Sequence, residues 1–111
     1  MAEAEMSKNL LNNLMKQAQQ MQERVKQLQE EAAGKTVEAS SGGGMVTVVA
    51  NGRQEVLSIK IDPSVVDPAD IEMLQDLISA AVNAALRKAQ EIMKDEMSRL
   101  TAGMGLPPGL I

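Results

Sequence analysis

The stretch that decides the fold is Leu11 to Ala32, which reads LNNLMKQAQQMQERVKQLQEEA. Its apolar residues recur at alternating spacings of three and four positions: Leu11, Leu14, Ala18, Met21, Val25, Leu28 and Ala32. This heptad pattern predicts one face of a continuous helix. A helix over about 6–33 is roughly 40 Å long at ~1.5 Å per residue, which is longer than a small sheet is wide. We therefore expect part of the helix to protrude.

The composition argues against an enzyme. The 111 residues include nine Met but no Phe, Trp, Tyr, Cys or His. Without His and Cys, the chain lacks the commonest general base, the commonest metal ligand and the thiolate nucleophile. The carboxylates Asp62, Asp67 and Asp70 cluster, but Asp62 is predicted to end a strand at a turn and Asp67 to cap a helix, and nothing arranges the three around a pocket. We expect no enzymatic activity, no metal and no small-molecule substrate.

Length, apolar content and charge restrict the domain organisation, the location and the partners that the chain can have. A chain of this length predicts a single domain over 1–111, and an aliphatic core without aromatic residues favours association with a second copy. The opening MAEAEMSKNL holds no apolar run typical of a secretory signal, and no stretch reaches the ~18 apolar residues of a membrane span. We expect a soluble cytoplasmic protein with no membrane partner. The net charge of −4 argues weakly against a nucleic-acid partner, but the charges are segregated along the chain.

Alternating residues predict three short strands at about 36–40, 45–50 and 53–61. Glycines 42–44 predict a hairpin turn with positive φ values, and no Gly-Lys-Ser/Thr follows them as a phosphate-binding loop would require. Asn51-Gly52 predicts a two-residue type I′ turn, which would place Ala50 opposite Arg53. One face of the hairpin then carries Val46, Val48, Ala50, Leu57, Ile59 and Ile61, and we expect it to pack on helices.

The second helix is predicted over about 68–102, with Asp67 as its N-cap and Pro68 at its first position. Glycines end it, and a flexible tail is expected over 103–111. Both helices would overhang the sheet, so we expect their free halves to pair. Small residues on the second helix would let the two backbones approach closely: Ala80, Ala81, Ala84, Ala85 and Ala89.

The predicted order is helix, three-stranded antiparallel meander and long helix, an α+β fold. Three strands leave two open sheet edges and a half-apolar outer face of Met45, Thr47, Val49, Val56, Ser58 and Lys60. Two copies joined through their sheets would cover these surfaces. The sequence therefore predicts a homodimer with two protruding helical arms.

Several segments, in this order, resemble the YbaB/EbfC family of bacterial nucleoid-associated proteins. They are residues 13–22, the glycine turn at 42–44, Ile61 to Ser64, Met73 to Leu77 followed by Ala80-Ala81, and Pro107 to Gly109. Where many members carry Glu, this chain has Gln75. The resemblance implies a tweezer-like homodimer with protruding helices that is cytoplasmic and nucleoid-associated. It would bind double-stranded DNA with little sequence preference and without a cofactor.

If the resemblance holds, phosphate contacts would come from the basic residues of the two helices. The candidates are Lys16, Arg24, Lys26, Arg87, Lys88, Lys94 and Arg99. The alternative is a chaperone-like module whose helical arms bind proteins and do not bind DNA, since Met6, Met15, Met21, Met93 and Met97 offer adaptable apolar side chains. For each basic residue, a purely solubilising role on a helix face remains open.

Overall fold

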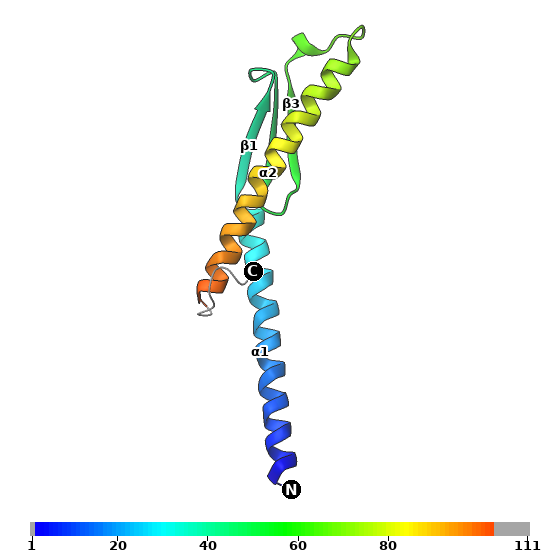
Figure 1. The fold of residues 1–111 in the computed structure, drawn as a ribbon. Helices are drawn as coiled ribbons and strands as arrows, with labels where there is room; N and C mark the ends of the chain where they lie inside the picture. The colour runs from blue at the N-terminus through cyan, green and yellow to red at the C-terminus, as the bar shows by residue number, and fades with distance from the viewer. Residues whose placement is uncertain (1, 104–111) are drawn as a thin grey trace.

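The computed structural model describes residues 2–103 of the chain. It consists of α1 (Ala2–Ala33), β1 (Thr36–Ser41), β2 (Val46–Asn51), β3 (Val56–Ile61), the short 3₁₀ helix η1 (Pro63–Val65) and α2 (Ile71–Gly103). The molecule is elongated, with extents of 80 × 24 × 20 Å. Figure 1 shows α2 lying across the sheet while α1 leaves the sheet and continues alone. Most of the tail predicted over 103–111 lies outside the described residues.

The sheet is the predicted antiparallel meander, with strand order β1-β2-β3. Ala39 pairs with Val48 across β1 and β2, and Val48 pairs with Ile59 across β2 and β3. Residues paired in this way point to the same face of a sheet. Glycines 42, 43 and 44 make the β1–β2 turn, and their φ values of 60°, 68° and 97° confirm the predicted left-handed turn.

The core lies between one face of this sheet and α2. Its buried members are Ala39, Val46, Val48, Ala50, Ala81, Ala85 and Ala89. The alanines of α2 were expected to face the other helix, and this expectation is wrong because Ala81, Ala85 and Ala89 pack on the sheet. Small side chains at this spacing let α2 lie close to the strands. Because α2 contacts mainly β1 and β2, it leaves β3 largely uncovered.

The turn between β2 and β3 differs from the predicted two-residue type I′ turn. The Gln54 amide donates to the Asn51 carbonyl at 2.9 Å, and the Asn51 amide donates to the Glu55 carbonyl at 3.0 Å. The left-handed residue is Gln54, with φ 61°, so three residues form the loop. The Asn51 side chain stabilises this turn by accepting from the amides of Arg53 and Glu55. As a result β3 begins at Val56, and Ala50 pairs with Val56 and not with Arg53.

Gly52 has a packing role in this loop. Its amide donates to the carbonyls of Ala32 at 2.9 Å and Lys35 at 3.1 Å, which ties the hairpin to the end of α1. A Cβ at this position would lie 2.6 Å from Ile92 Cγ2 and 2.7 Å from the Ala32 carbonyl oxygen. Such distances are below van der Waals contact, so only glycine fits where α1, α2 and the hairpin meet.

The two helices pair only near the sheet, which corrects the expectation that their free halves form a hairpin. Leu28 and Ala32 of α1 are buried, whereas Leu11 and Leu14 are 57% and 53% exposed. Figure 1 shows α2 ending beside the middle of α1, with the N-terminal half of α1 extending beyond it. This half of α1, over residues 2–20, is the arm.

The start of α2 also differs from the prediction. Asp67 accepts from the Ala69 amide at 2.9 Å and so forms a local turn before the helix. Asp70 accepts from the Met73 amide at 3.2 Å, which makes Asp70 the N-cap. The helix therefore begins at Ile71, after the prolyl turn, because Asp70 and not Asp67 satisfies its first free amides.

Every residue of β3 is exposed in the isolated chain. The face that carries Ile59 and Ile61 was expected to pack on helices, but α2 does not reach it. The exposed fractions are 41% for Val56, 54% for Leu57, 45% for Ile59 and 37% for Ile61. An edge strand that exposes several large apolar side chains is a surface typical of association.

Candidate nucleic-acid interface

The arm and its continuation carry three of the seven candidate residues, Lys16, Arg24 and Lys26. All three are exposed. Between residues 6 and 22, α1 holds Lys8 and Lys16 and no acidic residue, and its other polar positions are mainly Asn and Gln. Among the described residues, no ion pair within 4 Å involves any of these bases. This part of α1 therefore presents positive charge and amide groups to the solvent.

Arg87 and Lys94 lie on the outer face of α2, away from the sheet. They are seven residues apart, so they point in nearly the same direction about 10 Å from each other along the helix. Both side chains are exposed, and Glu91 lies between them on the same helix. This acidic neighbour weakens the positive potential of the pair.

Lys88 and Arg99 have partners within the chain. The Lys88 Nζ donates to the Glu38 carbonyl of β1 at 2.8 Å. The Arg99 guanidinium lies 3.6 Å from a carboxylate oxygen of Glu96. Because each of these two side chains already has a partner within the chain, they are less available to phosphates than the others.

The structure brings Arg24 and Arg99 together from opposite helices. They line one hollow of about 240 Å³ between α1 and α2, together with Gln27, Leu28, Glu31, Glu96 and Leu100. Two carboxylates in the lining offset the two guanidinium groups. The other five candidates do not line this hollow, so the seven residues do not form one continuous surface.

The opposite end of the molecule is acidic. Residues 61–86 hold Asp62, Asp67, Asp70, Glu72 and Asp76 and no basic residue. Three of these carboxylates have local structural roles, and the bond from the Ser64 amide at 2.9 Å holds the pKa of Asp62 below its usual value. Figure 1 shows this acidic end at the far side of the sheet from the arm. This acidic end therefore contrasts with residues 6–22 of α1, which hold two bases and no acid.

Glu96 is the only buried acidic residue among the described side chains, and its exposed fraction is 3%. Its carboxylate forms an ion pair with Lys35, which follows α1, and lies near Arg99. The hydrogen bond from Lys35 lowers the pKa of Glu96, although burial acts in the opposite direction. This pair joins the end of α1 to α2. Sequence reasoning missed it because 61 positions separate the partners.

We expect Glu96→Gln to destabilise the protein by several degrees in Tm at neutral pH, and this difference should shrink in acid. Because folding lowers the pKa of Glu96, its stabilisation is complete above the ordinary value of 4.5 and is lost as the pH falls through the folded-state pKa. Thermal unfolding between pH 7 and about pH 3 measures this. Glu91→Gln, on the exposed face, is the control. A Glu96→Gln effect that stays constant across this range would contradict the role of the ion pair.

The described residues contain no group of three or more side chains that could hold a metal ion. In the same part of the chain, no helix is long and apolar enough to cross a membrane.

The fold and the distribution of charge define a class: an elongated α+β protein with a projecting, amide-rich helix whose charges over residues 6–22 are all basic. The sequence profile of the YbaB/EbfC DNA-binding family matches residues 6–104. The chain belongs to this family, which is a DNA-binding family and not a known enzyme family.

Relatives and a solved structure agree with this assignment. A nucleoid-associated protein of Acetivibrio thermocellus is 61% identical over 100 residues, which cover 90% of this chain and 88% of the relative. One from Syntrophobacter fumaroxidans is 59% identical over 102 residues, covering 88% and 93%. The crystal structure of an uncharacterized protein from Helicobacter pylori is similar with a TM-score of 0.69 at 29% identity, covering 78% of this chain and 91% of that one.

Proposed function

We propose that this protein is a nucleoid-associated, cytoplasmic protein that binds duplex DNA through α1, with little sequence preference. The observation that carries the proposal is the contrast in charge: an exposed helix with Lys8 and Lys16 and no acid over residues 6–22 projects at one end, and five carboxylates without a base lie at the other. Phosphates are attracted to the helix with the two lysines and repelled by the end with the five carboxylates. The family assignment supports DNA as the partner.

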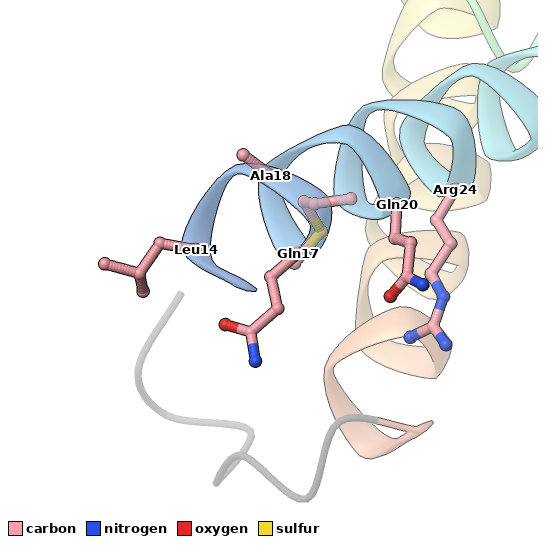
Figure 2. A pocket seen from close by; sticks show the side chains of 6 residues that line it. Leu14, Gln17, Ala18, Gln20 and Arg24 are labelled. Carbon is pink, nitrogen blue, oxygen red and sulfur yellow. The ribbon is translucent and has the colours of Figure 1, made fainter. Parts of the chain in front are cut away.

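Within this proposal, Lys16, Arg24 and Lys26 make the main phosphate contacts. Arg87 and Lys94 contribute less because Glu91 lies beside them. Lys88 and Arg99 contribute less because Lys88 donates to β1 and Arg99 pairs with Glu96. Gln17 and Gln20 extend to the same side of α1 as Arg24 (Figure 2), where their amides can donate to phosphate oxygens. All of these proposed contacts are to phosphates, which are the same at every base pair. We therefore propose weak sequence preference.

We further propose that the protein acts as a homodimer joined through β3. The exposed Val56, Leu57, Ile59 and Ile61 and the unpaired edge of β3 support this arrangement. A strand that meets its own copy across a two-fold axis gives a self-complementary interface. Such a dimer presents two arms, so that three bases on each α1 would meet about six phosphates.

The test is DNA affinity over a salt series. With about six phosphates neutralised, log K should fall against log salt with a slope of roughly −5. For Lys16→Gln/Arg24→Gln, which removes two contacts on each copy, we expect a slope of roughly −2 and an affinity at least tenfold lower at about 50 mM salt. Fluorescence anisotropy of a labelled duplex measures both quantities.

The matched control is Arg87→Gln/Lys94→Gln, which removes the same charge from the outer face of α2. We expect it to retain most of the affinity and the slope. If this control loses binding while the α1 variant keeps it, the proposed surface is wrong. If the unmodified protein shows no DNA binding at low salt, the proposed function is wrong.

A protein-binding function is the second candidate, and the exposed Leu10, Leu11, Leu14 and Met15 of the arm favour it. Apolar side chains with more than half of their surface exposed are typical of binding surfaces for other polypeptides. Suppression of the aggregation of a denatured client, without any shift of duplex DNA, would support this candidate in place of the first.

A further inference from the structure

The arm presents an apolar surface that the described residues leave open. More than half of the surface of Leu10, Leu11, Leu14 and Met15 is exposed, and we call these four residues the open stripe. Leu11 and Leu14 belong to a seam that continues along α1 at heptad spacing to Leu28, which is buried where α1 and α2 pair. One face of α1 therefore packs on a helix near the sheet, and the same face has no partner further along within residues 2–103.

The pattern of the open stripe is symmetric about its own midpoint, which lies between positions 12 and 13. Residues of similar size and polarity lie at equal distances on either side of this point: Leu11 with Leu14, Leu10 with Met15, and Ser7 with Ala18. A two-fold interface requires such symmetry, because residue i of one copy contacts residue j of the other and j contacts i. The stripe therefore fits a second copy of itself that runs in the opposite direction.

Two arms paired in this way overlap over residues 4–21, or about 27 Å at ~1.5 Å per residue. At the centre, Leu11 of each copy packs against Leu14 of the other. On both sides of this centre, Ser7 of one copy lies opposite Ala18 of the other, and these small side chains let the two helices approach closely. All four positions are uncharged, so the seam of the pair buries no ionised group.

The position of α2 selects the antiparallel direction. Leu100 of α2 and Arg24 of α1 line the same hollow, and α2 ends beside the middle of α1 (Figure 1), so α2 covers α1 from about this level towards the sheet. A parallel partner would follow the seam into the covered region and collide with α2. An antiparallel partner reaches Met21 with its first residues and stops before this region.

Pairing of the arms is compatible with the proposed phosphate contacts. At about 100° per residue, Lys16 is rotated by about 170° and Gln20 by about 150° from the mean direction of Leu11 and Leu14. Figure 2 shows Ala18 of the seam and Gln20 pointing to opposite sides of α1. Arg24 lies beyond the overlap, so these phosphate-binding side chains stay on the outside of the pair.

We propose that the open stripe is a contact between two copies of this protein, whose arms pair antiparallel over residues 4–21. Four apolar side chains of about 100 Å² each on both copies come to roughly 800 Å². Interfaces below about 1,200 Å² are typical of weak and transient association. Because a dimer joined through β3 carries two arms, the contact would link such dimers into reversible chains. This linkage rests on the proposed dimer, whereas the pairing of two arms does not.

Disulfide cross-linking tests the register, since the chain has no cysteine of its own. Chains with Ser7→Cys, labelled with ¹⁵N, are mixed with unlabelled Ala18→Cys chains, and both variants keep the whole open stripe. Both also carry Ile59→Lys, which removes the proposed β3 contact. We expect the mixed disulfide to form at least tenfold faster than either self-disulfide, because two copies of position 7 lie about 17 Å apart along the antiparallel pair. Mass spectrometry measures the three products.

The matched control replaces Ala18→Cys with Gln19→Cys, which rotates the thiol by about 100° around α1. Its mixed disulfide should form at least tenfold more slowly. Equal rates for Ala18→Cys and Gln19→Cys would show random collision without a defined seam and would overturn the proposal. Self-disulfides that form faster than the mixed one would indicate a parallel pair, which also contradicts it.

Sedimentation velocity up to about 0.5 mM protein provides an independent measurement. For Leu11→Lys/Leu14→Lys, we expect association beyond the β3 dimer to weaken at least tenfold, while Asn12→Lys/Asn13→Lys, with the same added charge on the other side of the helix, should associate as the unmodified protein does. Equal losses in both variants would assign the effect to charge and not to the stripe.

If the unmodified protein shows no association beyond the β3 dimer in this range, the stripe belongs to a different polypeptide and the proposal is wrong. Circular dichroism checks that every variant keeps its helices. Neither experiment contains DNA, so a failure of the proposed DNA binding would leave both results unchanged.

Discussion

Replacing Ile59 with lysine is expected to convert the proposed dimer into a folded monomer. Ile59 lies in the middle of β3, where 45% of its surface is exposed in the single chain. A lysine there keeps its ammonium group in water in the monomer, so folding should be little affected. In a β3 interface the same group would be buried without a partner, which raises the dimer Kd by about 30-fold or more.

Sedimentation velocity over a dilution series measures this change, and circular dichroism confirms that the monomer is folded. Ser40→Lys is the matched control because Ser40 is an exposed position on β1, the opposite edge of the sheet. The control should remain dimeric at the same concentrations. If Ile59→Lys dimerises as tightly as the unmodified protein, β3 is not the interface. If Ser40→Lys alone dissociates, the interface lies at β1.

Gly52→Ala is expected to cost about 3 kcal/mol of the free energy of unfolding, the upper end of the range for inserting atoms into a packed site. Its new methyl group would lie 2.6 Å from Ile92 Cγ2, 2.7 Å from the Ala32 carbonyl oxygen and 2.9 Å from Ala32 Cβ. The carbonyl belongs to the backbone, so a change of side-chain rotamer cannot relieve that contact. For a domain of this size, we expect Tm to fall by about 15 °C.

Gly43→Ala separates this steric effect from a general loss of glycine. Gly43 has a φ of +68°, and a methyl group added to its Cα would meet nothing within 4 Å, so alanine there meets only backbone strain. We expect a loss of about 1 kcal/mol. Urea unfolding of the three proteins gives both values. Equal losses for Gly43→Ala and Gly52→Ala would show that the contacts with Ala32 and Ile92 do not govern the junction.

Sequence patterns predicted the order of the elements because the signals for it are local. The heptad spacing of Leu11 to Ala32 and the glycines at 42–44 each act over a few residues. The register between β2 and β3 could not be predicted from such local patterns, because it depends on a side-chain interaction. The side chain of Asn51 accepts hydrogen bonds from the backbone amides of Arg53 and Glu55. This interaction favours a three-residue loop over the type I′ turn that Asn-Gly usually forms.

Contacts between distant segments escaped prediction. The role of Gly52 arises from its position against Ala32 and Ile92, and the Lys35–Glu96 pair joins residues that are 61 positions apart. Likewise, charge alone selected Lys88 as a candidate for DNA binding, but no pattern indicated that Glu38 of β1 would accept its hydrogen bond. A single sequence identifies basic residues on helices without showing which of them have partners in the fold.

The junction at Gly52 also determines how the arm behaves mechanically. α1 is a lever of 32 residues, or about 48 Å at ~1.5 Å per residue, that is fixed at one end. A rotation of about 5° at that pivot would move its tip by about 4 Å, a displacement comparable to the rise of one base pair. Close packing against Ala32 and the Lys35–Glu96 pair both resist such rotation. The stiffness of a contact between a few small groups thus sets the precision with which a distant tip is held.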